Sequence, residues 1–390
     1  MVPNSLRHKV RRLNAWMSVG FLAISLSACD YQADTAKPKD SESRINDTVG
    51  WAKTAQIGRF EGVRGLEWVS EQEIGFSRTV KAEESRGRYE TTRGVLSIRN
   101  GEIRDTQPWG WNDTRFVSPD GKHAYTVLRR SEGENLYAKH VIEELATGRN
   151  VSVSAENVAG TGLWLDNESY LLIPGIGEGP AQKIGLNGTA TPLPALSEKI
   201  LQNPEKFQSS GHFRKAGDRI YYLERNGPGT VHRLNYFSIK DLEQPVVTSV
   251  DMDDDVTRYE ISPDGNKIAI VKFVSSNGNS EYELVLADRD GAEAAGGPIW
   301  KSRSLFELSW SPDSSKLALS GRSAPDSADR TMIVDVAAGG IEQAFECKRS
   351  TVPALWSPSG NKLMITADEG ETGIEAFPVV HIIRLEQDKR

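Results

Sequence analysis

The sequence lacks the residues and motifs on which several common chemistries depend. Only 2 of its 390 residues are cysteine, which excludes a disulfide scaffold and a cysteine-based structural zinc site. Acidic residues outnumber basic ones by 54 to 47, so nucleic acid is not an expected partner. No H-E-x-x-H, P-loop or dinucleotide fingerprint occurs, and the segment nearest to a nucleophile elbow, residues 75–79, lacks the final glycine. We therefore predict no catalytic residue, metal or cofactor.

Histidines are few and dispersed. Beyond residue 28 the chain has His123, His140, His212, His232 and His381, with no pair at a ligand-like spacing. We expect them to be surface or strand-packing residues. A site that takes one residue from each of several repeats would not be visible in the spacing, so a catalytic arrangement of this kind stays an alternative.

The first residues have the pattern of a secretory signal. Four basic residues precede a short apolar stretch, residues 13–26, which ends in Leu26-Ser27-Ala28-Cys29. These four positions resemble the lipobox of bacterial lipoproteins. The resemblance implies that residues 1–28 are removed and that Cys29 carries the lipid, palmitate included; several acyl chains hold a protein at a bilayer persistently. The alternatives are an uncleaved anchor and a chance cysteine after an ordinary signal.

The residues after Cys29 form the expected link between lipid and body. Residues 29–47 are polar with a single aromatic, as in a flexible tether. Removal of residues 1–28 takes away four bases and lowers the net charge from −7 to −11. Asp30 resembles the signal for retention in the inner membrane of enteric bacteria, but the choice between inner and outer membrane stays open. Cys347 is then the only other thiol, expected as a buried strand residue, with an intermolecular disulfide as the alternative.

An internal repeat organises the rest of the chain. Ser-Pro-Asp-Gly or a close variant follows an apolar residue at Val117, Ile261, Trp310 and Trp356, and weaker copies follow Trp68, Trp164 and a position near residue 214. These seven anchors are 46 to 50 residues apart, so residues 48–390 hold seven units and no further domain.

Each unit has the pattern of four short strands, the first two joined by a tight turn in which Pro, Asp and Gly favour the required backbone conformations. A sheet of this size cannot bury both faces alone, so neighbouring sheets must stack. The predicted fold is therefore an all-β, seven-bladed β-propeller. The four anchor tryptophans are expected to pack between blades. The last unit lacks a fourth strand, which we expect residues 49–57 to supply, closing the ring.

The repeats resemble the WD40-like repeats of TolB-like propellers, which also occur in prolyl oligopeptidases and dipeptidyl peptidases. The resemblance covers nearly all of residues 48–390 and implies the fold rather than a function. Two departures matter: the Tol protein carries a further α/β domain and is soluble, and the peptidases carry a hydrolase domain for which no residues remain here.

Propeller topology places the loops between second and third strands, together with the connections between blades, on one face. We call it the long-loop face; the predicted loops are 81–93, 129–135, 173–181, 224–230, 274–281, 321–330 and 368–375. An acidic run lies between the fourth and fifth units, and we expect it to be a solvated loop rather than a calcium site. With acids of the last unit it predicts an electronegative docking surface for a basic partner; the residues are Asp251, Asp253, Asp254, Asp255, Asp368, Glu369 and Glu371.

These features predict a periplasmic propeller, anchored to a membrane through Cys29, that acts as a non-catalytic interaction module in envelope assembly, maintenance or transport. The alternative is an enzyme or ligand binder with its site at the central channel, such as a lactonase- or lyase-like propeller. A sensor subunit of a membrane complex is a third possibility that the sequence does not separate from the first.

Overall fold

The computed structural model describes residues 52–81, 89–109, 114–132, 135–154, 160–174, 179–201, 213–225, 232–250, 255–276, 279–294, 297–305, 307–322, 328–350, 352–369 and 378–387. The predicted signal, Cys29 and the tether lie outside these residues. In the described part, no helix has both the length and the apolar character needed to cross a membrane.

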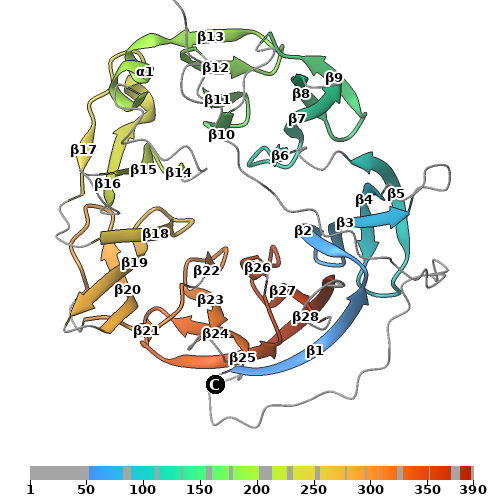
Figure 1. Cartoon of the computed structure of the whole chain (residues 1–390), viewed down its shortest axis with the longest axis vertical. Helices are drawn as coiled ribbons and strands as arrows, with labels where there is room; N and C mark the ends of the chain where they lie inside the picture. Colours follow the sequence, from blue (N-terminus) through green and yellow to red (C-terminus); the bar gives the residue numbers. More distant parts are fainter. Residues whose placement is uncertain are drawn as a thin grey trace, which may run out of the picture. The chain divides into compact units, whose positions relative to one another are not determined.

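The described strands form seven four-stranded antiparallel sheets, arranged as a ring in Figure 1 with the first strand of each sheet nearest the centre. The predicted seven-bladed propeller is confirmed. Blades 1 to 3 consist of β2 (Arg64–Ser70), β3 (Glu73–Lys81), β4 (Tyr89–Ser97) and β5 (Ile103–Trp109); β6 (Thr114–Val117), β7 (His123–Glu132), β8 (Asn135–Glu144) and β9 (Arg149–Ser152); and β10 (Gly160–Trp164), β11 (Ser169–Pro174), β12 (Ala181–Gly185) and β13 (Ala190–Leu193).

The remaining blades follow the same order. Blades 4 to 6 consist of β14 (Arg214–Ala216), β15 (Arg219–Arg225), β16 (His232–Ser238) and β17 (Thr248–Ser249); β18 (Asp255–Ile261), β19 (Lys267–Ser276), β20 (Asn279–Asp288) and β21 (Trp300–Ser302); and β22 (Glu307–Trp310), β23 (Lys316–Arg322), β24 (Asp329–Asp335) and β25 (Ile341–Cys347). Blade 7 combines β26 (Leu355–Trp356), β27 (Lys362–Asp368) and β28 (Pro378–Gln387) with β1 (Ala52–Glu61).

The repeat turn is held by its serine. In blade 5, the buried Ser262 Oγ donates to Asp264 Oδ1 at 2.6 Å and accepts from the backbone N–H of Lys267 at 2.9 Å. Ser311 makes the same two bonds in blade 6. The fourth turn position has a positive φ in both turns, 72° at Gly265 and 61° at Ser314, a conformation that normally favours glycine. The turn chemistry therefore fixes the register of the two inner strands.

The four anchor tryptophans connect blades 1, 3, 6 and 7 to the preceding blade of the ring. The indole Nε1 of Trp310 donates to the Glu260 carbonyl at 3.1 Å, and that of Trp356 donates to the Ser309 carbonyl at 3.0 Å. Trp68 and Trp164 bond in the same way to the carbonyls of Leu355 and Phe116, at 2.9 and 2.8 Å. Every acceptor lies one residue before an anchor. The predicted packing of these tryptophans between blades is confirmed.

The ring is closed by the N-terminal strand. β1 pairs antiparallel with β28 along its whole length, from Ala52 opposite Gln387 to Glu61 opposite Val379. Figure 1 shows β1 lying along the outer side of blade 7. The predicted outer strand is thus confirmed for the described residues from 52 onward, with residues 49–51 outside them. The side chain of Phe60 is fully buried against blades 7 and 1, so the closing strand also contributes to the core.

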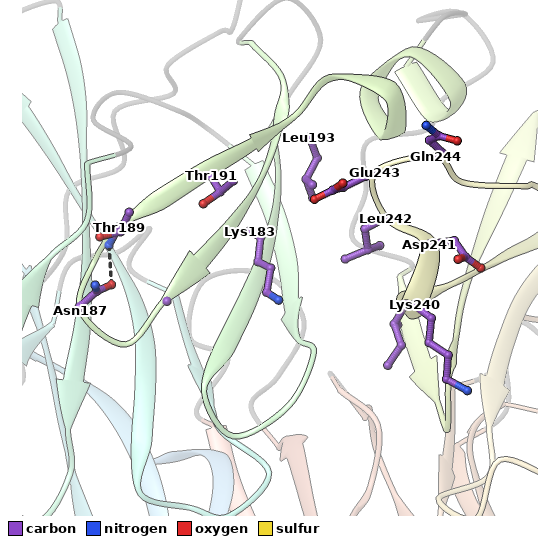
Figure 2. A pocket seen from close by; sticks show the side chains of 12 residues that line it. Lys183, Asn187, Thr189, Thr191, Leu193, Lys240, Asp241, Leu242, Glu243 and Gln244 are labelled. Carbon is purple, nitrogen blue, oxygen red and sulfur yellow. Dashed lines mark hydrogen bonds between the residues drawn. The ribbon is translucent and has the colours of Figure 1, made fainter.

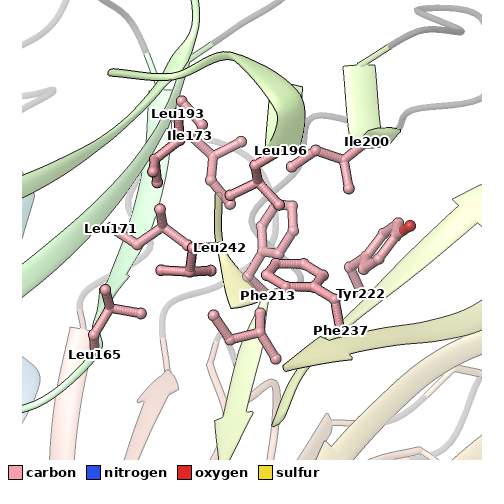
Figure 3. Close-up of a cluster of buried hydrophobic side chains, with 12 residues drawn as sticks. Leu165, Leu171, Ile173, Leu193, Leu196, Ile200, Phe213, Tyr222, Phe237 and Leu242 are labelled. Carbon is pink, nitrogen blue, oxygen red and sulfur yellow. The ribbon is translucent and has the colours of Figure 1, made fainter. Parts of the chain in front are cut away.

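Blade 4 departs from the repeat. Its fourth strand β17 has only two residues, and the preceding connection contains the 3-10 helix η1 (Ile239–Asp241). A short helix, α1 (Pro194–Leu201), follows β13, and Figure 3 shows its Leu196 and Ile200 against Phe213, Tyr222 and Phe237 of blade 4. The sequence analysis predicted only strands here, because the apolar residues of α1 are too few to show a helical period.

Every predicted long loop includes residues that belong to strands, and two of these loops consist mostly of strand. Residues 129–132 belong to β7, which pairs through to Glu132 opposite Asn135, and residues 274–276 belong to β19, which pairs through to Ser276 opposite Asn279. The polar composition of both segments had suggested loops, but their residues continue the strands. The long-loop face is therefore formed partly by projecting hairpins.

Replacing Trp356 by Phe tests the connection between blades. The substitution removes the bond to the Ser309 carbonyl and leaves a small cavity in the buried cluster, so we expect the free energy of unfolding to fall by about 1–3 kcal/mol. Urea denaturation followed by circular dichroism measures it. Trp300→Phe is the control, since Trp300 lies on an outer strand and is only partly buried. An equal loss in both variants would contradict the assigned role.

Candidate functional site

The predicted acidic docking residues fall into three groups. Asp251, Asp253, Asp254 and Glu371 lie outside the described residues. Asp255 begins β18. Asp368 and Glu369 lie together at the end of β27, on the long-loop face. The structure therefore places the backbone of Asp255 and positions Asp368 and Glu369 together, and the role of all three in docking stays a prediction.

Glu369 is engaged by two groups of its own blade. Arg59 on β1 donates from Nη2 to Glu369 Oε2 at 2.5 Å, and the other oxygen lies 2.7 Å from Nε2 of His381 on β28. Arg59 also pairs with Glu61. The sequence predicted Glu369 as part of an electronegative docking surface. Strand pairing instead places Arg59 opposite His381, which brings both beside Glu369.

His381 and Cys347 are buried at the same end of the junction between blades 6 and 7. The ring of His381 lies 4.6 Å from the ring of Phe345. Burial raises the pKa of the Cys347 thiol to about 12, and the negative charges of Asp329 and Glu369 add to the rise. A thiol in this environment stays protonated at neutral pH and reacts poorly. The prediction of a buried strand cysteine is confirmed.

Charged residues on the inner strands pair across blades. Arg214 of β14 makes a bidentate contact with Glu260 of β18, at 2.9 Å from Nε to Oε2 and 2.8 Å from Nη2 to Oε1. Arg258 of β18 pairs with Glu307 of β22. These pairs link blades 4, 5 and 6 near the channel. Within the described part of the chain, no group of three or more His, Cys, Asp or Glu side chains is placed to hold a metal ion.

A groove at the outer rim separates blades 3 and 4. It has a volume of about 690 Å³, within the usual range for binding sites. One wall comes from β12, β13 and their turn, and the other from η1 and the residues after it (Figure 2). The lining residues are Lys183, Gly185, Asn187, Thr189, Thr191, Leu193, Ile239, Lys240, Asp241, Leu242, Glu243 and Gln244.

The departure of blade 4 from the repeat creates this groove. A two-residue fourth strand leaves the outer part of blade 4 to η1, whose Ile239 N–H donates to the Asp218 carbonyl at 2.8 Å. The floor is apolar, since Leu193 and Leu242 belong to the core cluster between the two blades. The walls carry both signs of charge, with Lys183 and Lys240 on one hand and Asp241 and Glu243 on the other.

Sequence reasoning did not find the groove. The weak fourth repeat near residue 214 and the polar stretch 238–249 were the available signals, because a unit that loses its pattern is where a blade changes shape. The groove also lies on the rim, whereas the prediction placed binding on the long-loop face.

No protein-family model matches the chain, and no curated protein matches it. Among solved structures it is similar to an oligogalacturonate lyase in complex with manganese, at 14% identity over 90% of this chain and 99% of that one, with a TM-score of 0.55. The propeller domain of the Trilobed protease from Pyrococcus furiosus is 14% identical, over 85% and 100%, with a TM-score of 0.54.

TolB from Acinetobacter baumannii is also among the similar structures, at 15% identity over 71% of this chain and 65% of that one, with a TM-score of 0.41. The resemblance to β-propellers is confirmed for the fold by the seven four-stranded sheets and by the two structures with TM-scores of 0.55 and 0.54. At such identities these likenesses show the fold alone.

We predict that His381 makes stability depend on pH. Burial lowers the pKa of this imidazole below its usual 6.5, although the Glu369 carboxylate opposes the shift. The unfolded chain therefore binds a proton at a higher pH than the folded chain does. The contribution is present above pH 6.5 and is lost as the pH falls through the folded pKa.

The measurement is urea unfolding between pH 5 and 7.5. Wild-type protein should lose stability toward pH 5 more steeply than His381→Gln, with His123→Gln in blade 2 as the control. Identical pH slopes for wild type and His381→Gln would refute the assignment.

Proposed function

We propose that the chain is a lipid-anchored periplasmic propeller that acts as a non-catalytic module and binds a protein of the cell envelope in the groove between blades 3 and 4. The observation that carries the proposal is the groove itself, which has a volume of about 690 Å³, two buried leucines in its lining and side chains of both charge signs. A rigid scaffold with a preformed groove loses little conformational entropy on binding.

The chemistry of the groove favours an extended polypeptide segment. The apolar floor of Leu193 and Leu242 suits one or two aliphatic side chains, and the threonines and amides of the walls suit a peptide backbone. The lysines and the acidic pair can meet charges of either sign along such a segment. Envelope location rests on the lipobox, whose Cys29 would hold the propeller at a membrane surface.

The anchor is tested by Cys29→Ser. We expect the variant to lose incorporation of labelled palmitate and to leave the membrane fraction, because the thiol that receives the diacylglycerol is gone. Cys347→Ser is the matched control and should keep both properties. Membrane association unchanged in Cys29→Ser would refute lipid anchoring while leaving the groove proposal intact.

The groove is tested by site-specific photocrosslinking in cells. A photoreactive residue at the exposed Thr191 should give one discrete adduct with an envelope protein, and the same residue at Asn150, exposed on the outer strand of blade 2, should not. Thr191→Trp fills the groove without changing the core, so it should weaken binding of the captured protein at least about tenfold, or about 1.4 kcal/mol.

Two results would contradict this proposal. Equal adducts from positions 191 and 150 would indicate contact without specificity. Unchanged affinity in Thr191→Trp would show that the captured protein binds elsewhere. A photoreactive residue at Glu369 would then test binding at the long-loop face. The alternative of an enzyme or ligand binder at the channel stays a prediction, and loss of function from substitutions at Arg214 and Glu260 but not at Thr191 would support it.

A further inference from the structure

The groove between blades 3 and 4 has four charged residues in its lining, and they differ in whether the protein already pairs them. Two are basic and two are acidic: Lys183, Lys240, Asp241 and Glu243. A charge that lies beside an opposite charge of the same protein attracts a ligand less, because the two fields partly cancel. The unpaired charges therefore indicate what the groove recognises.

Lys240 is already paired. Its Nζ lies 3.5 Å from Asp218 Oδ2, and the other carboxylate oxygen of Asp218 lies 3.4 Å from Nη2 of Arg289 in blade 5. The Asp218 carbonyl also accepts the Ile239 N–H at 2.8 Å. Asp218 thus holds both the backbone and the lysine of η1, and Figure 2 shows Lys240 directed away from β12.

Lys183 and Glu243 are the unpaired charges that face the groove. Both side chains are exposed, and neither forms an ion pair or a side-chain hydrogen bond within the described part of the chain. Lys183 extends from β12, and Glu243 projects from the opposite wall toward β13 (Figure 2). Asp241 is also unpaired, but Figure 2 shows its carboxylate on the side of η1 away from β12. One positive and one negative charge are therefore available to a ligand.

The carboxylate of Asp166 is close enough to interact electrostatically with Lys183, but it is occupied within its own turn. Its Oδ1 accepts hydrogen bonds from the N–H groups of Glu168 and Ser169 and from the Ser169 hydroxyl, at 2.7 to 2.9 Å. Lys183 thus keeps a charge that the carboxylate of a ligand can meet.

The apolar part of the lining is small. Leu193 and Leu242 are buried in the core cluster between the two blades, and Ile239 is partly buried against it. An aliphatic side chain of a ligand can contact their accessible edges, together with the methylene groups of the lysines. Because this apolar area is limited, the selectivity of the groove depends mainly on its charges.

The face of the blade 3 sheet forms the groove, and its free edge does not. Thr189, Thr191 and Leu193 all line the groove, and alternate residues of a strand point to the same face. β13 is the outermost strand of the sheet, and Pro192 in it has no N–H to donate to a further strand. A bound segment is therefore recognised through its side chains.

We propose that the groove binds an extended segment in which an aliphatic residue lies between an acidic and a basic residue, at alternate positions. Alternate side chains of an extended chain point to one face about 7 Å apart, so all three can face the groove together. The acidic side chain pairs with Lys183 and the basic one with Glu243. This inference rests on the proposed function, because it specifies the segment that the groove takes.

Three fluorescein-labelled nine-residue peptides test this charge pattern on the purified full-length protein. Each has a central leucine, and the residues two positions before and after it are Asp and Lys, two Asp, or two Lys. We expect the mixed peptide to bind at least about fivefold more tightly than the other two, measured by fluorescence anisotropy, because each of those places like charges together. Thr191→Trp, which fills the groove, should weaken the mixed peptide at least about tenfold.

Reversing one charge of the groove should reverse its preference. Lys183→Glu leaves two acidic groups and should favour the peptide with two Lys, whereas Glu243→Lys should favour the peptide with two Asp. Lys122→Glu and Glu102→Lys, in exposed turns of blades 2 and 1, change the net charge equally and should keep the wild-type preference. The comparison holds for either direction of the bound segment, since the pattern is symmetric about the leucine.

Three results would overturn the charge pattern: equal affinities of the wild-type protein for the three peptides, no binding of any peptide at about 1 mM, or a preference that neither reversal changes. An adduct from Thr191 in cells together with one of these results would leave the proposed function intact. A preference that switches as expected, without an adduct in cells, would support the charge pattern and contradict the envelope partner.

Discussion

The structure depends on one constraint: a four-stranded sheet of these dimensions has two faces to bury, and the described part of the chain forms no helix layer to cover them. Stacking against both neighbours is the available solution, and a ring is the arrangement that leaves no outermost face. The contact between adjacent blades is therefore the unit of stability. Trp310 shows how a single residue stabilises this contact. Its indole packs between blades 5 and 6 and donates a hydrogen bond to the Glu260 carbonyl.

This constraint explains how much of the fold could be predicted. The turn after Ile261 and the turn after Trp310 need the same residue types for the same backbone reason, so the repeat is written directly into the chain. Counting the repeats then gave the number of blades, and the missing last strand gave β1. Both predictions rest on short-range patterns of turn and strand residues, which recur in every unit and can be recognised directly in the sequence.

The candidate site could not be predicted in this way. Glu369 is adjacent in space to Arg59, which lies 310 positions away in the sequence, and their contact exists only because β1 completes blade 7. Likewise, the groove depends on β17 having two residues and on η1 lying beside β12 and β13. A blade that deviates from the repeat can be recognised in the sequence. The deviation predicts that the blade differs in structure, but it does not predict which contact or groove results.

Deviations from the repeat occur in two kinds of place in the ring, at the rim of a blade and in the interface between two blades. Where blade 4 departs from the pattern, the core between blades 3 and 4 is preserved by α1 and Phe213, so a groove forms on a firm base. Where blades 1 and 2 meet, the departure lies in the strands that face each other, because Arg93 of β4 is buried beside Glu67 of β2. A deviation at the rim creates a groove, whereas one in the interface changes which side chains two blades bury against each other. One ring can thus contain both kinds of deviation, since each junction is built from its own pair of faces.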